Sequence, residues 1–269
     1  MRTSSSRTRA IRSLGDLAAA FVRPVRTTPA RAVGTPAVVV PRTAQVLMGG
    51  AVVRQTDPTT CGSTALLMLA ASGDPVLARW LEDGTLPDGL TIAELPPEIP
   101  PAALARPLTA GERIAAAQLR IKERTSVRAL GPWRWPSRFG TPPWTAAREA
   151  RFPGVRYRHR PVDDRGEAGR TMVTLVLNAL RSGHPVLLFT GGNVGNGLVK
   201  ALPRHVVLAV PGRSASVTAA GDAVIPIFDP AAGRVYEVVA GDLLDRTTPL
   251  PALGGWTHVQ WFALLVPAA

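Results

Sequence analysis

The chain has 269 residues, of which 46% are hydrophobic, and its 31 basic and 19 acidic residues give a formal net charge of +12. This length and apolar content suit a substantial folded core, as one large or two small domains. The single cysteine excludes an intrachain disulfide, and no run approaches the ~20 apolar residues that a membrane span needs.

The first 45 residues hold much of the positive charge, because eight arginines face one acidic residue, Asp16. Their richness in Ser, Thr, Arg and Pro predicts a basic, disordered tail, and residues 46–269 are expected to form one domain. No recognition helix or basic motif with interleaved aromatic residues stands out, so we expect no nucleic-acid partner. The tail has no convincing signal-peptide core, which favours the cytoplasm.

The only cysteine, Cys61, lies at a predicted helix start. Thr59 and Thr60 are suitable N-cap residues, and residues 62–71 are rich in strong helix formers. A cysteine in the first helical turn meets unpaired backbone N–H groups and the positive end of the helix dipole, which favour the thiolate. Gln55, six residues earlier, could join the Cys61 N–H in binding an oxyanion. The alternative is that Cys61 is a small buried apolar residue.

The middle of the chain is expected to be largely helical. Residues 86–107, with six prolines, read as a connecting segment. Thr109 and Glu112 match a capping box that opens a helix over residues 109–125. The Trp-rich stretch 131–144 either lines a substrate groove or fills the core from a loop.

The second half alternates between strands and one helix. Alternating residues predict a half-buried strand over 155–161, and a helix is expected over 171–182 with Thr171 as its cap. The apolar run 184–190 predicts a strand. The following Gly-rich segment, 190–197, lacks a phosphate-loop ending and is expected to form a hairpin loop that could act as a flap.

A base and its orienting carboxylate are predicted from two later strands. His205 opens an apolar run that ends at Val210, and a second predicted strand, over residues 223–229, ends at Asp229. An antiparallel hairpin that pairs His205 with Asp229 also pairs Val210 with Val224. This register places a carboxylate beside the imidazole, where it can fix the tautomer and stabilise the imidazolium.

The other three histidines are weaker candidates for the base. His159 reads as a core histidine of a half-buried strand, and His258 belongs to a closing strand without an evident acidic partner. His184, at a strand start, is the second choice. No two histidines share a metal-ligand spacing and the cysteine stands alone, so no metal or other cofactor is expected.

Gln55, Cys61-Gly, a late His205-Val-Val and Asp229-Pro occur in an order that resembles the papain-like cysteine peptidases. The resemblance is closest to the bacterial peptidases that process bacteriocins after double-glycine leaders, and to their stand-alone relatives. It implies that Cys61 is the nucleophile, His205 the base, Asp229 its orienting partner and Gln55 an oxyanion donor. It also implies an α+β, papain-like fold, in which an N-terminal nucleophile helix and a helical region pack on a C-terminal antiparallel sheet.

The function expected from these residues is hydrolysis of a peptide bond in a peptide or protein substrate. Two alternatives stay open: an acyl transferase of the same fold, and a catalytically inactive module that binds peptides. The sequence does not decide the substrate or the oligomeric state.

Overall fold

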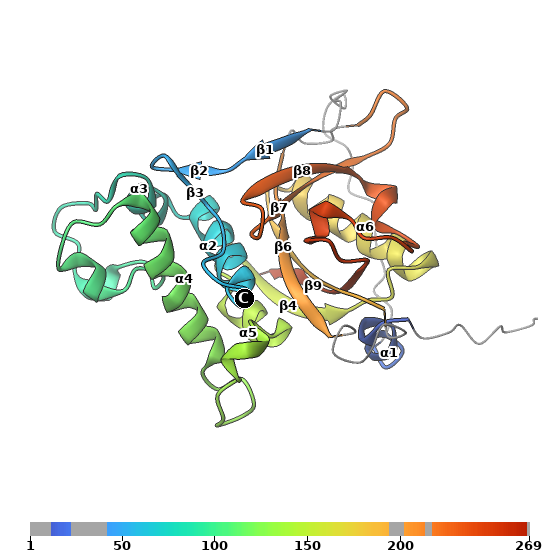
Figure 1. Cartoon of the computed structure of the whole chain (residues 1–269), viewed down its shortest axis with the longest axis horizontal. Coiled ribbons are helices and arrows are strands. Elements are labelled where there is room, and N and C mark those ends of the chain that lie inside the picture. Colours follow the sequence, from blue (N-terminus) through green and yellow to red (C-terminus); the bar gives the residue numbers. More distant parts are fainter. Residues whose placement is uncertain (1–11, 23–41, 194–201, 213–216, 268–269) are drawn as a thin grey trace, which may run out of the picture.

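The computed structural model describes residues 12–22, 42–193, 202–212 and 217–267 (Figure 1). The helices in these ranges are α1 (Leu14–Ala19), α2 (Cys61–Gly73), α3 (Pro75–Asp83), α4 (Ala110–Ser126), α5 (Pro143–Glu149) and α6 (Gly166–Arg181). The strands are β1 (Thr43–Gln45), β2 (Leu47–Met48), β3 (Ala51–Val52), β4 (Val155–Pro161), β5 (Val186–Gly191), β6 (Pro203–Ala209), β7 (Val224–Asp229), β8 (Arg234–Val239) and β9 (His258–Pro267). Two short 3₁₀ turns, η3 (Ser137–Phe139) and η6 (Pro251–Leu253), matter for the site.

Seven strands form one sheet in the order β1-β8-β7-β6-β5-β9-β4, and every neighbouring pair is antiparallel. All six residues of β5, an interior strand of the sheet, are buried. The expected α+β class with a large antiparallel sheet is therefore confirmed. The sheet is not purely C-terminal, however, because the edge strand β1 comes from residues 43–45.

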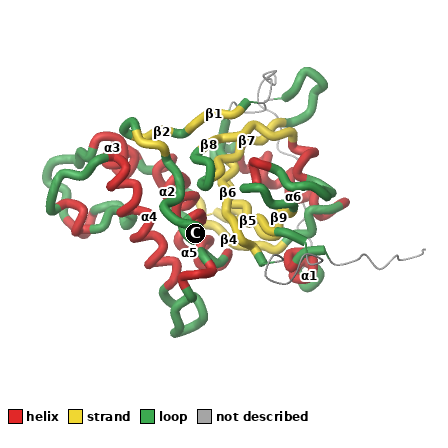
Figure 2. Tube along the Cα trace, in the orientation of Figure 1, coloured by secondary structure: helices red, strands yellow, loops and turns green. Residues whose placement is uncertain are grey.

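Helices cover both faces of the sheet. Alternate β5 residues point to opposite sides, so Leu187 and Phe189 join the cluster around α2, while Val186 and Leu188 join the cluster around α6. Figure 2 shows the same division, with α2 to α5 gathered beside the yellow strands and α6 on the other side.

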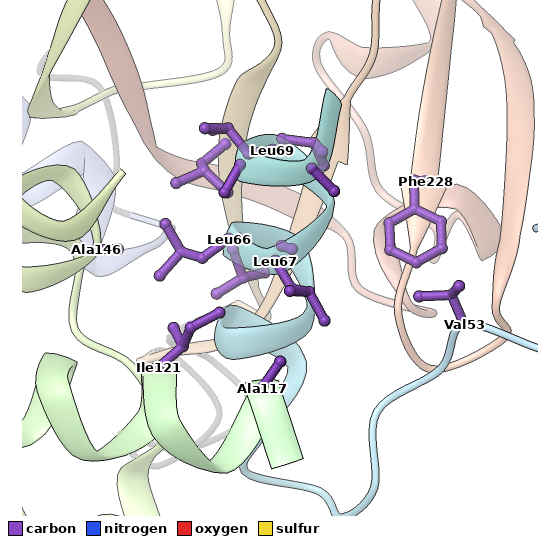
Figure 3. Close-up of a cluster of buried hydrophobic side chains, with 14 of the residues drawn as sticks. Val53, Leu66, Leu67, Leu69, Ala117, Ile121, Ala146 and Phe228 are labelled. Atoms are coloured by element: carbon purple, nitrogen blue, oxygen red, sulfur yellow. The ribbon is translucent and has the colours of Figure 1, made fainter. Parts of the chain in front are cut away.

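The helix α2 lies inside the larger cluster rather than on a surface. Its Leu66, Leu67 and Leu69 are almost fully buried, and Figure 3 shows them between α4, α5 and the sheet residue Phe228. A helix that is apolar all round is stable only when it is covered on every side. The residue at its start is consequently held by a rigid, packed element.

The capping-box helix is confirmed as α4. The Thr109 hydroxyl accepts a hydrogen bond from the Glu112 N–H, and the predicted apolar face of Ile114, Ala117 and Ile121 is buried. The predicted start of the next helix at Thr171 is wrong, because α6 begins five residues earlier, at Gly166. Glycines in this first turn have low helix propensity, so the pattern hides the true start.

Within the N-terminal 45 residues the structure describes residues 12–22 and 42–45, which contain the short helix α1 and the edge strand β1. Ser13 and Asp16 form a capping box for α1, and the buried Asp16 carboxylate lies 2.7 Å from Arg165 Nη2. A Cβ on Gly15 would lie 2.6 Å from the Gln260 carbonyl oxygen, so α1 packs closely on β9. The rest of the predicted tail, residues 1–11 and 23–41, lies outside the described residues.

Among the described residues no single helix is long and apolar enough to cross a membrane; only α2 and α3 taken together pass such a test, and they are bent by 115°.

Candidate active site

Cys61 is the first residue of α2 and is 3% exposed. Thr60 is the N-cap by position, but its hydroxyl oxygen accepts hydrogen bonds from the N–H groups of Thr56 and Asp57 instead of from the helix. The first-turn N–H groups therefore have no acceptor from the cap side chain. They leave the positive end of the helix dipole beside the thiol.

His205 and Asp229 form the predicted pair. His205 Nε2 lies 2.6 Å from Asp229 Oδ1, and both side chains are buried. The same carboxylate oxygen accepts the Ala231 N–H at 3.0 Å, so the turn after β7 fixes its position. With Nε2 occupied by Asp229, Nδ1 is the ring nitrogen that remains for a third group.

The predicted register of this hairpin is wrong by two residues. The structure pairs Leu208 with Phe228 and Ala209 with Ile227, so His205 and Asp229 are not directly opposite. A shift of two residues keeps side chains on the same face of a sheet. The two side chains are diagonal neighbours, a distance that an imidazole and a carboxylate can bridge.

Cys61 supplies the third group of the site. Burial lowers the pKa of His205, but its hydrogen bonds with Asp229 and with Cys61 outweigh that effect and raise the pKa to about 9. The charged imidazolium is thus the favoured form near neutral pH. An imidazolium in contact with a cysteine favours the thiolate, which is the nucleophilic form.

A glycine that the sequence reasoning missed holds the imidazole from the other side. Gly254 follows η6 with a φ of 68°, and a Cβ there would lie 2.2 Å from His205 Cδ2. Only a residue without a side chain lets this loop approach the ring so closely. No local sequence signal reveals this contact, because the two residues lie on separate elements.

Gln55 is tied to the same framework through its backbone. Its N–H donates to the Pro230 carbonyl at 2.9 Å, directly after Asp229. Its side-chain Nε2 donates to the Asp57 carbonyl at 3.0 Å, and its Oε1 is buried without a partner among the described residues. The described contacts thus join Cys61, His205 and Asp229, while the Gln55 amide is turned toward its own loop.

Another residue not foreseen, Gln118 of α4, supports the loop before Cys61. It is fully buried, its Oε1 accepts the Thr56 N–H at 3.1 Å, and its Nε2 donates to the Arg54 carbonyl at 2.9 Å. These two bonds clamp the backbone on both sides of Gln55. Gln118 is therefore a positioning residue for this loop.

Cys61 and His205 line one small recess of about 30 Å³. Its other walls come from the loop before α2, the η3 turn and the two residues after it, β5 and the start of β6. The residues are Pro58, Arg138, Phe139, Gly140, Thr141, Phe189, Pro203, Arg204 and Val206. The space admits little more than a water molecule, so only a narrow group can reach the thiol.

The Trp-rich stretch lies beside this recess and does not fill the core. Trp133 is 72% exposed and Trp144 is 37% exposed, while Trp135 packs edge-on to Trp144 with ring centroids 5.3 Å apart. Trp135 and Trp144 line a second cavity of about 210 Å³. Of the two predictions for this stretch, a substrate-groove lining and a loop that fills the core, the structure favours the first, because these rings line a cavity at the surface.

The other histidines do not reach the thiol. His159 is exposed on β4 rather than part of the core, and its ring lies edge-on to Trp144. His184, the second choice for the base, packs on Phe152. His258 has an acidic partner after all, because its Nδ1 lies 3.1 Å from Asp164 Oδ2 in the core.

Three carboxylates, of Asp16, Asp163 and Asp164, lie within 4.8 Å of one another. The guanidinium of Arg165 binds two of them, Asp16 and Asp163, each at 2.7 Å. A built-in cation thus already compensates this cluster, and the arrangement gives no support for a metal site.

The Gly-rich segment does join two adjacent antiparallel strands, β5 and β6, as predicted. Residues 194–201 lie outside the described residues, so the predicted flap falls where the structure says nothing.

Neither the protein-family models nor the curated proteins contain a match to this chain. Its function is therefore inferred from the geometry of the site.

Proposed function

We propose that the chain is a cysteine peptidase of papain-like architecture that hydrolyses a peptide bond. The observation that carries this proposal is the contact of His205 with two groups at once. One is the Asp229 carboxylate, at 2.6 Å, and the other is Cys61 at the start of a buried helix. This is the arrangement of nucleophile, base and orienting group that covalent acyl chemistry requires.

The reaction begins with the Cys61 thiolate and the His205 imidazolium. The sulfur attacks the carbonyl carbon, and the carbonyl π electrons move onto oxygen. The Cys61 backbone N–H stabilises this oxyanion, and the Gln55 amide has a second N–H that it can turn toward it. When the carbonyl reforms, the C–N bond breaks and the amine leaves with the proton of His205. A thioester remains on Cys61.

Water completes the cycle. His205, now neutral, takes a proton from water, and the resulting hydroxide attacks the thioester carbon. The C–S bond breaks, the carboxylic acid leaves, and the thiolate and imidazolium are restored. An amine in place of water would give acyl transfer by the same steps, so the products distinguish a peptidase from the alternative transferase.

The test is incubation of the full chain with a mixed peptide library, with products identified by mass spectrometry. Cys61→Ala should abolish cleavage, and His184→Ala, a histidine that packs on Phe152 outside both cavity linings, should leave it unchanged. Because Cys61 is the only thiol, the rate of iodoacetamide labelling reports on this residue alone. No cleavage, together with a labelling rate that rises only near the ordinary thiol pKa of ~8.5, would overturn the proposal.

A further inference from the structure

Two arginines converge on the recess that holds the thiol. Arg138 comes from the η3 turn and Arg204 from β6, and both line the wall around Cys61 and His205. Among the described residues neither has a carboxylate partner, and Arg138 only stacks over the Phe139 ring at 4.8 Å. These two are distinguished by lying at one opening from separate elements.

The adjoining cavity of about 210 Å³ is mainly apolar. Four residues line both spaces, Phe139, Thr141, Pro203 and Arg204, so the cavity lies directly beside the recess. Its further walls are aromatic or aliphatic: Leu14, Trp135, Pro142, Pro143, Trp144, Leu202 and Trp261. Rings of this kind give a rigid contact surface for a large apolar side chain.

Two residues of the cavity lining carry polar atoms that are buried inside the protein. Trp135 Nε1 is a buried donor and Thr141 Oγ1 a buried hydroxyl, and neither has a hydrogen-bond partner among the described residues. In contrast, Trp144 Nε1 is satisfied by the Ala129 carbonyl at 2.6 Å. The groups open to a ligand are therefore the exposed guanidiniums of Arg138 and Arg204 at the recess, and they suit a ligand that carries acceptor oxygens.

We propose, on the basis of the peptidase function above, that the substrate is a peptide segment with a large apolar side chain beside a carboxylate. The apolar side chain occupies the aromatic cavity, and Arg138 and Arg204 bind the carboxylate at the mouth of the recess. Arginine suits this role because its planar donors match a carboxylate. Both arginines are exposed, so salt weakens the interaction.

The experiment measures binding separately from cleavage. Fluorescein-labelled peptides that contain Phe-Glu, Phe-Gln, Phe-Lys or Ala-Glu in one constant frame are titrated into full-length Cys61→Ala by fluorescence anisotropy. We expect Phe-Glu to bind about tenfold more tightly than Phe-Gln or Ala-Glu, and Phe-Lys most weakly. The preference for Glu over Gln should shrink in 0.5 M NaCl, an ionic strength at which charges are screened beyond about 4 Å.

Substitutions of the arginines test whether the preference for Phe-Glu over Phe-Gln depends on the recess. Arg204→Gln and Arg138→Gln should each remove most of the preference for Glu, and Arg204→Glu should favour Phe-Lys. Arg134→Gln is the matched control, because Arg134 is exposed in the same stretch but lies outside both linings. Circular dichroism checks that each variant is folded. Equal affinity for Phe-Glu and Phe-Gln, or an equal loss in Arg134→Gln, overturns the inference.

The two proposals fail in different ways. If Cys61 cleaves peptides equally well with and without Glu, the peptidase function stands, and the proposal that the arginines bind a substrate carboxylate is wrong. If no peptide is cleaved but Cys61→Ala binds Phe-Glu through Arg204, the proposal that the arginines bind a carboxylate stands and the chain is a peptide-binding module.

Discussion

The molecule contains two buried histidine–aspartate pairs, whose histidines lie on the two strands that flank β5, and only one of the pairs meets a nucleophile. His205 of β6 binds Asp229, and His258 of β9 binds Asp164. On β5, which lies between these two strands, Thr190 pairs with His205 and Gly191 with His258. The residue types are the same and both pairs are buried. The two pairs differ in what lies next to the ring nitrogen that does not face the aspartate.

The His205 ring has Cys61 and an open recess on its far side, whereas the far nitrogen of His258 is buried without a partner among the described residues. Asp164 also accepts the Val259 N–H at 3.1 Å, so it ties together two parts of the core. Burial raises the pKa of Asp164, even though His258 and Val259 donate hydrogen bonds to it. A histidine–aspartate pair is thus a structural cross-link in one place and the base of a candidate active site in the other.

The largest effect is expected from the residue that distinguishes the two pairs. Cys61→Ala should lower turnover of a cleaved peptide by about 10⁴-fold or more, because the covalent step disappears. The free energy of unfolding should change by no more than about 1 kcal/mol, since a small buried group is lost. Peptide turnover and urea denaturation measure the two quantities. Residual activity near the wild-type level would separate Cys61 from the chemistry.

The same substitution, Asp→Asn, should mainly impair catalysis in the His205 pair and mainly reduce stability in the His258 pair. Asp229→Asn should lower kcat by about 10²- to 10⁴-fold, because the imidazole loses its orienting charge. Asp164→Asn should leave kcat per folded molecule unchanged but cost about 1 to 3 kcal/mol of stability, because buried donors lose a charged acceptor. The test is kcat together with the thermal unfolding midpoint for each variant. An equal fall in kcat for both would mean that the pairs are not functionally distinct.

Adjacent glycines test how tightly the His205 ring must be held. Gly254→Ala should lower kcat by about tenfold or more, because the new methyl group collides with the imidazole. Gly255 also has a positive φ, of 78°, but a Cβ there meets nothing within 4 Å. Both variants carry a similar backbone strain of about 1 kcal/mol, so their difference isolates the ring contact. If Gly255→Ala impairs turnover equally, the contact with the ring is not the cause.

A smaller effect concerns pH. The folded-state pKa of His205, about 9, lies above its ordinary value of 6.5. The stabilisation by the protonated ring is therefore fully present below about pH 6.5 and is lost as the pH rises through about 9. Relative to His205→Asn, the wild type should lose on the order of 2 to 3 kcal/mol of unfolding free energy across this window. Urea denaturation at pH 6, 7.5 and 9.5 measures this difference, and a constant difference would contradict the raised pKa.

The local parts of the site were accessible from sequence. A cysteine before an Ala- and Leu-rich run is a local signal, and it correctly placed Cys61 at the first position of α2. His205 and Asp229 were identified from strand patterns. The register was predicted wrongly by two residues, but His205 and Asp229 were still placed on the same face of the sheet, because side chains in a strand alternate with a period of two.

The missing parts depend on contacts between distant segments. Asp164 and His258 are 94 residues apart, and Asp16 and Arg165 are 149 apart, so no local pattern links them. The approach of Gly254 to His205 depends on how a loop folds back over the sheet. The side-chain direction of Gln55 is set by a carbonyl two residues away, a choice that residue type alone does not fix.

The solitary thiol has a consequence for oxidation. A sulfenic acid formed at Cys61 has no second cysteine in this chain with which to form a disulfide. Its recovery would depend on a reducing thiol from outside, and that molecule would have to reach a sulfur at the bottom of a recess of about 30 Å³. A recess this small hinders a bulky thiol reductant more than a water-sized oxidant, so oxidation at this site would be slow to reverse.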